Sequence, residues 1–559
     1  MSSVAYQLCA NVDKELAFFD TSLSSVRDDI KALGKKLSHR LSAEERGLFD
    51  AYLAMLDDKS LGREVTDAIK KGVVAPYAWS RVILQHANTF ASMHDPYLRE
   101  RAADVRDLGS RVLGYLQQQS STQEKIYPEN TILIGDELTA SILGEVPKDK
   151  LLGLVSVKGS SSSHVAILAR AMGIPTVMGA VDLPFTQLDG KVAIVDGYRG
   201  NTYFNPSDEV LREFTALIHE DQEISKHYES LRDLPAETQD HHRVPLWVNT
   251  GLMADVMRSI ERGAEGVGLY RTEVPFLLRD RFPTEEDQRK IYREQLAAFA
   301  PHPVTMRTLD VGGDKALNYF PIDEANPFLG WRGIRVTLDH PEIFMAQVRA
   351  MMRASQGLDN LRIMLPMISH ISELEASQQL IHRAHSELLE EGFSVKLPPI
   401  GVMIEVPAAV YQAKELAARA DFLSVGSNDL TQYLLAVDRN NPRVAGLYNA
   451  YHPAVLRALQ SVVTAAHSEG TPVSICGEMA GDPGASMLLM AMGYDVLSMN
   501  STNLPRVKSV LRATSLEQAE ALLASVMKLT DAETVAQYVD IALKKIGIRD
   551  RPQGLQPTH

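Results

Sequence analysis

Hydrophobic side chains in the first part of the chain recur every three to four residues, which is the spacing of amphipathic helices. This periodicity predicts helices over residues 48–56, 63–72, 76–94 and 96–118. Glycine is scarce here, and proline occurs only where two of these helices would begin. We therefore expect an antiparallel helical bundle over residues 1–118.

Short apolar runs replace the helical periodicity after this bundle. They predict strands at residues 131–134, 152–156, 175–178 and 191–196, with a short helix at 165–172 among them. These elements predict a compact α/β domain over residues 119–206. The strongly acidic stretch 207–236 is helical in pattern, and its charges indicate a solvated linker helix.

Eight short apolar runs, most of them separated by helix-length segments, follow in the last part of the chain. They are Val244–Val248, Gly266–Tyr270, Val304–Thr308, Arg362–Leu365, Ile400–Ile404, Phe422–Val425, Val473–Ile475 and Val496–Ser498. This alternation predicts a (β/α)8 TIM barrel over residues 237–559. An open doubly wound sheet is the alternative. The count of eight, and the lack of a Gly-x-Gly-x-x-Gly turn after the first strand, favour the barrel.

Composition and charge place the chain among multidomain globular proteins. Its 559 residues are 45% hydrophobic and 23% charged, which excludes disordered and low-complexity chains. The net charge of −14 argues against a general nucleic-acid binder. No apolar run reaches the roughly 18 residues of a membrane span, and the N-terminus lacks a visible secretory signal. With only two cysteines, Cys9 and Cys476, we expect no disulfide framework and a cytoplasmic location.

Polar and charged residues cluster just past the ends of the predicted barrel strands, where such barrels carry their catalytic groups. At these ends or on the loops that follow lie Arg271, Arg307, Asp310, Lys315, Arg332, Glu405, Asn428, Asp429, Arg439 and Cys476. Arginine pairs with phosphate and carboxylate through two parallel hydrogen bonds. The mouth of the barrel is therefore predicted to bind a small, highly charged anion.

Two of the acids, Glu405 and Asp429, are candidate ligands of a hard cation such as Mg²⁺. The cation would bridge these carboxylates and the phosphate oxygens of a substrate. The alternative is that the charges at the mouth pair only with one another.

A second candidate site lies in the α/β domain, where Lys158-Gly-Ser-Ser-Ser-Ser-His164 leads into a short apolar helix. His164 is predicted to lie in the first turn of that helix. The positive helix end disfavours imidazolium, so it keeps the ring neutral and nucleophilic. A phosphoryl group on the ring would meet free backbone N–H groups. The alternative is a polar capping histidine on a loop.

These segments together resemble a known family. The Gly-x-x-x-Ser-His segment with its Ala-Arg helix is similar to the phosphohistidine motif of phosphoenolpyruvate (PEP)-utilising enzymes. The barrel segments Leu-Tyr-Arg-Thr-Glu, Asp-Val-Gly-Gly-Asp-Lys, Asn-Pro-Phe-Leu-Gly-Trp-Arg, Gly-Ser-Asn-Asp-Leu-Thr-Gln-Tyr and Cys-Gly-Glu-Met-Ala-Gly match the family in order. Residues 97–109 are similar to its carrier-docking domain. Over about residues 10–548 the chain resembles enzyme I of the bacterial PEP-dependent phosphotransferase system.

The resemblance implies a mechanism and partners. PEP would bind in the barrel mouth with Mg²⁺, clamped by Arg271, Arg307, Lys315, Arg332, Asn428, Asp429 and Arg439, and the metal ligands would be Glu405 and Asp429. His164 would attack the phosphorus, and Cys476 would protonate the leaving enolate. The phosphoryl group would then pass to a histidine of a small phosphocarrier protein, HPr or its nitrogen-branch homologue, docked on the bundle. A homodimer formed through the barrel is also implied.

The segment around His164 resembles the nitrogen-related branch of the family more than the sugar branch, which implies a regulatory phosphorelay. That branch usually carries an N-terminal GAF sensor domain, and the family opens its phosphohistidine domain with a strand. We recognise neither here, and expect a form that begins just after that strand.

Two other functions fit parts of the pattern. Pyruvate phosphate dikinase and PEP synthase share the phosphohistidine unit and the barrel, but they also need a nucleotide-binding domain. We find no Gly-rich nucleotide loop. A catalytically silent regulatory scaffold is the second alternative. It predicts that key motif residues are missing, whereas all are present.

Overall fold

The computed structural model describes residues 4–37, 59–91, 96–117, 127–136, 149–158, 172–181, 183–251, 253–277, 281–313, 319–441 and 443–548, with residues 53, 56, 138, 143, 146, 147, 165, 166, 169, 315 and 317 between them. The chain divides into two compact units that meet in the sequence between His219 and Glu220. No helix within these described ranges is long and apolar enough to span a membrane.

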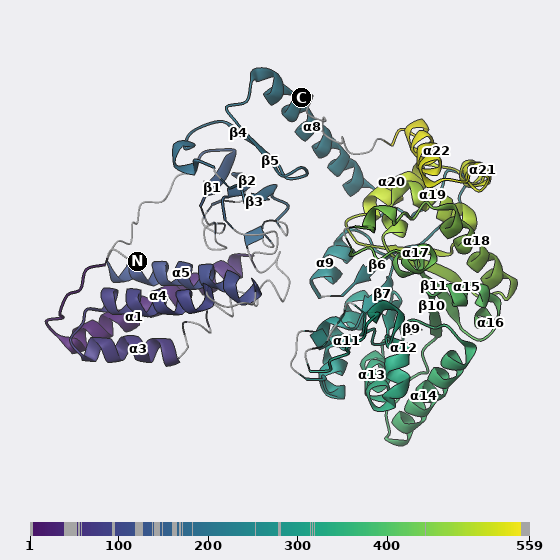
Figure 1. Cartoon of the computed structure of the whole chain (residues 1–559), viewed down its shortest axis with the longest axis horizontal. Helices are drawn as coiled ribbons and strands as arrows, with labels where there is room; N and C mark the ends of the chain where they lie inside the picture. Colours follow the sequence, from purple (N-terminus) through teal and green to yellow (C-terminus); the bar gives the residue numbers. More distant parts are fainter. Residues whose placement is uncertain are drawn as a thin grey trace. The chain divides into compact units, whose positions relative to one another are not determined.

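A bundle of long helices begins the first unit (Figure 1). Its helices are α1 (Val12–Leu37), α3 (Lys59–Lys70), α4 (Ala75–Ala91) and α5 (Pro96–Leu116). The indole N–H of Trp79 on α4 donates to the carbonyl of Gly109 on α5 at 2.8 Å, which ties the two helices together. The helical prediction for this region is confirmed. The helix expected at 48–56 lies almost wholly outside the described residues.

The same unit contains two small sheets. Strands β1 (Thr131–Gly135), β2 (Leu151–Ser156) and β3 (Thr176–Met178) pair in parallel in that order, and β4 (Ala193–Asp196) pairs with β5 (Asn201–Phe204) in an antiparallel hairpin. A 3-10 turn, η1 (Phe185–Gln187), lies between β3 and β4. The four predicted strands are confirmed. The sequence analysis predicts no strand at β5, whose four residues, Asn201–Phe204, form only a short run near the end of the predicted domain.

Helix α8 (Asp208–Ser230) leads out of the first unit, and none of its residues is buried. This agrees with the acidic, solvated helix that the sequence predicts for the stretch. Its last turn lies in the second unit, where the ring of His227 lies 3.3 Å from the hydroxyl of Ser509.

The second unit contains a closed barrel of eight parallel strands with helices around it (Figure 1). The strands are β6 (Leu246–Thr250), β7 (Val267–Arg271), β8 (Val304–Arg307), β9 (Leu361–Leu365), β10 (Ile400–Ile404), β11 (Phe422–Gly426), β12 (Val473–Cys476) and β13 (Val496–Met499). The barrel closes where β13 pairs with β6. The predicted TIM barrel is confirmed, and the open sheet is excluded.

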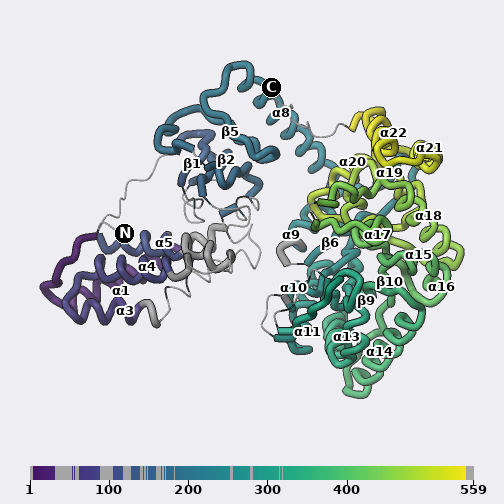
Figure 2. Tube along the Cα trace, in the orientation of Figure 1, coloured from purple at the N-terminus to yellow at the C-terminus, as the bar shows by residue number. Residues whose placement is uncertain are grey.

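Helices follow the strands around the barrel, as the tube in Figure 2 traces from teal to yellow. They are α9 (Met253–Glu261), α10 (Val274–Leu277), α11 (Glu285–Phe299), α12 (Ile334–Asp339), α13 (Pro341–Ser355), α14 (Ile371–Glu390), α15 (Pro407–Tyr411), α16 (Ala413–Ala417), α17 (Ser427–Leu435), α18 (Pro453–Ser468), α19 (Pro483–Met492), α20 (Leu504–Ala513), α21 (Leu516–Val526) and α22 (Ala532–Lys545), with the 3-10 turns η2 (Pro327–Leu329), η3 (Ala445–Leu447) and η4 (Met479–Gly481). Several follow local sequence signals. Thr284, for example, starts α11 with a capping box, in which its side chain and that of Asp287 each accept the other's backbone N–H.

Alternation along each strand decides which side chains enter the barrel. On β10, Val402 and Ile404 belong to the large core shared with the outer helices, whereas Met403 belongs to a small apolar cluster inside the barrel. Glu405 continues the inward set, one position past the strand end. A Cβ on the inward Gly401 would come within 2.4 Å of the Phe422 ring, so only glycine fits there.

Candidate active site

The sequence-predicted residues at the strand ends occupy one edge of the barrel. Arg271 and Arg307 are the last residues of β7 and β8, and they are partners in the ladder between those strands. Cys476 ends β12 and pairs with Gly426 at the end of β11. Since the carboxyl ends of parallel strands share one edge, these side chains surround a common mouth. Arg271 is exposed there, whereas Arg307 is buried.

Four charged side chains at the mouth form a closed ring of ion pairs. Arg307 contacts Glu273 through Nη2 and Oε1 at 2.7 Å, and Asp310 through Nη1 and Oδ2 at 3.0 Å. The Nζ atom of Lys315 lies 3.0 Å from the same oxygen of Glu273 and 2.6 Å from Oδ2 of Asp310. Both acids are buried, so each cation of the ring lies between two desolvated carboxylates.

A chain of ion pairs extends from this ring to α17. Arg332, only 2% exposed, donates to both oxygens of Asp310 at 3.1 and 3.2 Å and to Oδ2 of Asp429 at 2.9 Å. The other oxygen of Asp429 lies 3.2 Å from Nη1 of Arg439. A further N–H of Arg332 donates to the hydroxyl of Tyr433 at 3.4 Å. The structure therefore joins Arg307, Lys315, Arg332, Asp429 and Arg439 in one network.

The cations of the ring keep its two acids ionised. Burial alone would raise the pKa of Asp310, but the charges of Arg307 and Lys315 outweigh burial and hold the pKa well below its ordinary value. The same balance lowers the pKa of Glu273. Conversely, burial would lower the pKa of Arg307, and the two acids raise it. The mouth therefore holds fixed charges of both signs.

Glu405 behaves differently from the acids of the ring. Burial, together with the nearby negative charges of Asp429 and Asp310, raises its pKa to about 7. Its Oε1 accepts the backbone N–H of Met367 at 2.7 Å, which fixes the carboxylate. A Cβ on Gly426 would lie 2.9 Å from its other oxygen, so a glycine at this strand end leaves room for the carboxylate. Glu405 is thus an acid placed where its charge is poorly compensated.

Asn428 and Cys476 complete the predicted set. The side-chain oxygen of Asn428, in the first turn of α17, accepts the backbone N–H of Glu478 at 3.0 Å, which links the loops after β11 and β12. Cys476 is 2% exposed and packs with the apolar cluster inside the barrel. The hydroxyl of Ser424 donates to its sulfur at 3.7 Å. Burial raises the pKa of the Cys476 thiol to about 11.

Sequence reasoning assigned no role to Glu273. The signal was present, because Glu273 is the acid of the Leu-Tyr-Arg-Thr-Glu segment, two positions after Arg271. Its partner Lys315 lies 42 positions away along the chain, so the pairing becomes visible only in three dimensions.

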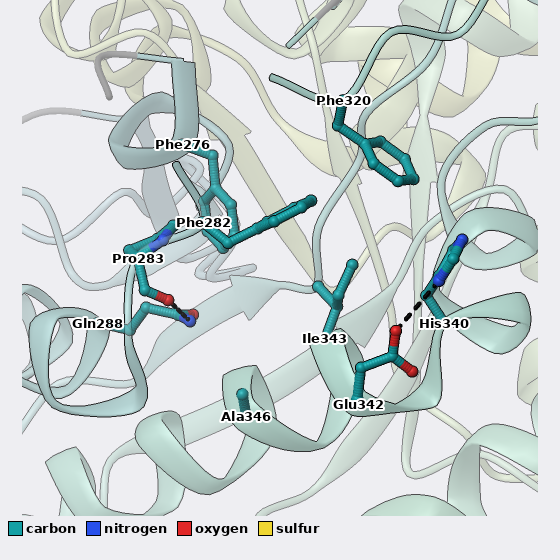
Figure 3. Close-up of a pocket in the computed structure, with 9 residues that line it drawn as sticks. All are labelled: Phe276, Phe282, Pro283, Gln288, Phe320, His340, Glu342, Ile343 and Ala346. Atoms are coloured by element: carbon teal, nitrogen blue, oxygen red, sulfur yellow. Dashed lines mark hydrogen bonds and ion pairs between the residues drawn. The ribbon is translucent and has the colours of Figure 1, made fainter. Parts of the chain in front are cut away.

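The loop after β8, residues 308–333, has a charged face and an apolar face. Asp310 belongs to the charged network, whereas the neighbouring Leu309 and Val311 belong to a separate apolar cluster with Phe276. A cavity of about 430 Å³ borders this apolar side (Figure 3), and its lining residues are Phe276, Phe282, Pro283, Gln288, Phe320, His340, Glu342, Ile343 and Ala346. Packing of the apolar face therefore supports the segment that carries the charges.

Two parts of the predicted chemistry are not placed by the structure. His164 and the serines before it lie outside the described residues. The described residues contain no group of three or more histidine, cysteine, aspartate or glutamate side chains arranged to hold a metal ion. Any cation at Glu405 and Asp429 would need ligands from a substrate as well.

Comparison with known proteins decides which family the chain belongs to. The family model described as "PEP-utilising enzyme, PEP-binding domain" matches residues 225–516, and these residues contain the whole charged network. The N-terminal domain of the same enzymes matches residues 3–101, and their mobile domain matches residues 127–200. A phosphoenolpyruvate-protein phosphotransferase of Staphylococcus carnosus is 37% identical over 95% of this chain and 93% of its own length. The chain belongs to the PEP-protein phosphotransferase family.

Other relatives match most of this chain as well. A protein of Salmonella typhimurium named "Phosphoenolpyruvate-dependent phosphotransferase system" is 43% identical over 96% of this chain and 72% of its own length. The Haemophilus influenzae phosphotransferase is 36% identical over 95% of this chain and 92% of its own length. Among solved structures, "N-terminal domain of Enzyme 1 - Nitrogen" is 36% identical, with a TM-score of 0.30, and covers 39% of this chain and 89% of its own. The resemblance to enzyme I is confirmed, and with it an enzyme of PEP-dependent phosphotransfer.

Proposed function

We propose that this phosphotransferase moves the phosphoryl group of PEP to His164 and from there to a histidine of a small phosphocarrier protein, releasing pyruvate. The observation that carries the proposal is the network at the barrel mouth. It pairs four cations with buried carboxylates, with exposed Arg271 beside it. Such preorganised charge is what phosphoryl transfer requires of a protein.

PEP binds at this mouth through its phosphate and carboxylate. Arg271, Arg307, Arg332, Arg439, Lys315 and Asn428 are the groups assigned to it. Four of these cations, Arg307, Lys315, Arg332 and Arg439, already contact acids. The incoming anion therefore exchanges places with carboxylates instead of filling an empty positive pocket. This exchange favours a doubly anionic small molecule over a single weak anion.

Glu405 and Asp429 are assigned to a magnesium ion, and their chemistry fits one. Both provide oxygen ligands. Oδ1 of Asp429 is buried and forms an ion pair with Arg439 at 3.2 Å, but it accepts no hydrogen bond from the described residues. The repulsion that helps raise the pKa of Glu405 to about 7 would be relieved by a cation beside it. When magnesium is bound there, it supplies positive charge against the phosphoryl oxygens. Glu405, just past the end of β10, and Asp429, on α17, would hold it.

Cys476 is assigned as the acid that completes the reaction. As the bond between phosphorus and the enolate oxygen breaks, a nitrogen of His164 bonds to phosphorus and the enolate carbon takes a proton. The pKa of about 11 keeps the thiol protonated at neutral pH, so a proton is available for that carbon. The Ser424 hydroxyl donates a hydrogen bond to the Cys476 sulfur and so fixes its position.

The remaining assignments concern the first unit and the partners. The segment around His164 is assigned as the phosphoryl acceptor on the strength of its motif and of the mobile-domain match over 127–200. The bundle of α1, α3, α4 and α5 is assigned as the docking surface for the carrier, HPr or its nitrogen-branch homologue. The barrel domain, residues 237–559, is assigned to dimerisation, as in the family.

Incubation with PEP labelled in its phosphate, with and without magnesium, tests the proposal. We expect label on His164 only with magnesium present, and pyruvate released in equal amount. The His164→Ala protein should bind PEP as the parent does and take up no label. Label on another residue would contradict the assignment of His164. Labelling from ATP in place of PEP would instead favour the pyruvate phosphate dikinase alternative.

A further inference from the structure

We propose that Glu273 is a positioning residue that sets Arg307 and Lys315 for the phosphoryl group of PEP. When the phosphate binds, the contact between Glu273 and Lys315 breaks, and both carboxylate oxygens of Glu273 then bond to Arg307. This inference rests on the proposed function, because it takes the barrel mouth as the PEP site. Glu273 itself does not contact PEP, and it acts through the two cations.

Both ion-pair contacts of Glu273 involve the same one of its two carboxylate oxygens. Its Oε1 contacts both Arg307, at 2.7 Å, and Lys315, at 3.0 Å. Its Oε2 is buried and has no hydrogen-bond partner among the described residues. The Nε atom of Arg307 is likewise buried without a partner in the described part of the chain. One ion pair therefore contains both an orphaned acceptor and an orphaned donor.

A single rearrangement would satisfy both atoms. Arginine and carboxylate prefer two parallel hydrogen bonds, and a buried polar atom without a partner is unfavourable. The pair is held to one bond because Oε1 is shared with Lys315. Lys315 is the most exposed member of the ring, with 23% of its side chain accessible, so it is the cation that an incoming phosphate reaches first. Its departure frees the carboxylate to form the two-bond arrangement.

The backbone around Glu273 is fixed independently of this exchange. The hydroxyl of the preceding Thr272 donates to the carbonyl of Arg307 at 2.7 Å, and the amide of Gln347 donates to that hydroxyl at 3.1 Å. The Glu273 side chain therefore extends from a backbone segment that these hydrogen bonds hold in place. Asp310, in contrast, also contacts Arg332, so the Asp310 carboxylate stays in place when Lys315 moves.

The full-length Glu273→Gln protein separates positioning from binding. Label exchange between PEP and pyruvate is measured with magnesium, which needs no carrier protein. We expect kcat to fall by roughly 10- to 100-fold, because a misplaced clamp slows transfer. The KM for PEP should stay equal or fall, since the substitution removes a negative charge from an anion site. Glu273→Asp should recover part of kcat, because it restores the charge on a shorter arm.

Glu285→Gln is the matched control. Glu285 also bridges two arginines, Arg349 at 3.0 Å and Arg353 at 2.6 Å, but on the outer layer of the same barrel. Its loss should lower the melting temperature and leave both kinetic parameters unchanged. If Glu273→Gln folds poorly, Glu273→Asp takes its place. With the Lys315→Met protein and the corresponding double variant it forms a mutant cycle, in which we expect strongly non-additive losses of kcat.

Two results would overturn the inference about Glu273. One is a Glu273→Gln enzyme with kcat and KM both unchanged. The other is a Glu273→Gln enzyme with a raised KM and an unchanged kcat, which is the mark of plain binding. Arg307→Ala is measured alongside. An active Arg307→Ala enzyme would refute the proposed PEP site itself, whereas an inactive one beside a normal Glu273→Gln enzyme would refute only the positioning role.

Discussion

Two buried or half-buried arginines lie at opposite ends of the barrel interior and are held in different ways. Arg307, at the mouth, lies between the carboxylates of Glu273 and Asp310. Arg362, near the start of β9, has its guanidinium carbon 3.8 Å from the ring centre of Phe422 and 5.3 Å from that of Trp247. One end of the barrel therefore holds its cation with acids, and the other holds it with aromatic faces.

This difference separates a reactive end from a structural one. Burial lowers the pKa of Arg362 to about 10, with only partial compensation from Asp421. At the mouth, the acids outweigh burial and raise the pKa of Arg307. A cation paired with carboxylates can be passed to an incoming anion, because the acids can find other partners in the network. A cation packed on two rings has no such alternative and serves packing.

Replacing Arg307 by alanine should have the largest effect. It removes charge-assisted hydrogen bonds from PEP, worth about 1.5–3 kcal/mol, so affinity should fall roughly 10- to 150-fold. It also leaves Glu273 and Asp310 partly unpaired in a buried site, which costs about 3–5 kcal/mol of folding free energy. Calorimetric titration with PEP and denaturant unfolding measure the two effects.

Arg349→Ala is the control for that substitution. Arg349 is also mostly buried and contacts Glu285, Glu387 and Glu391, none of which is assigned to PEP. It should lower stability without changing PEP affinity. Equal losses of affinity in both proteins would show that the Arg307 effect comes from general destabilisation.

Replacing Arg362 by methionine should have an intermediate effect, confined to stability. The substitution loses cation–π contacts worth about 0.5–2 kcal/mol, but it also removes a charge that burial disfavours. We expect the unfolding free energy to change by about 1 kcal/mol or less, with kcat and KM for PEP unchanged. A large drop in kcat would show that the two ends of the barrel are coupled, and the contrast drawn between them would be wrong.

Strand alternation explains which parts of this site could be predicted from sequence. Arg307, Glu405 and Cys476 lie at or next to strand ends in inward register, so locating the strands was enough to gather them at one mouth. Glu273 lies past its strand, in a turn, and its role depends on a lysine in a distant loop. Only the folded structure brings such pairs together.

Binding an anion and pairing with one another are compatible roles for the charges at the mouth. The sequence left open whether these charges bind an anion or pair with one another. They do pair, through Arg307, Lys315 and Arg332, and such pairing is also how a protein keeps several like charges close together without a ligand. His164 remains a prediction, since it lies outside the described residues.

The smallest effect concerns the apolar layer between the two ends, where Cys476 packs with Phe422. Because its pKa is raised from 9.0 to about 11, the protonated thiol contributes stability that is complete below pH 9 and is lost as the pH rises toward 11. With a thiol-reactive disulfide reagent at pH 8, the partly exposed Cys9 should react quickly, and Cys476, which is 2% exposed at the mouth, should react much more slowly. In the Cys476→Ala protein, the decline in melting temperature between pH 9 and 11 should be shallower than in the parent. Fast reaction of both thiols at pH 8 would show that water reaches this layer, and the acid-lined mouth would then not be isolated from the arginine at the far end.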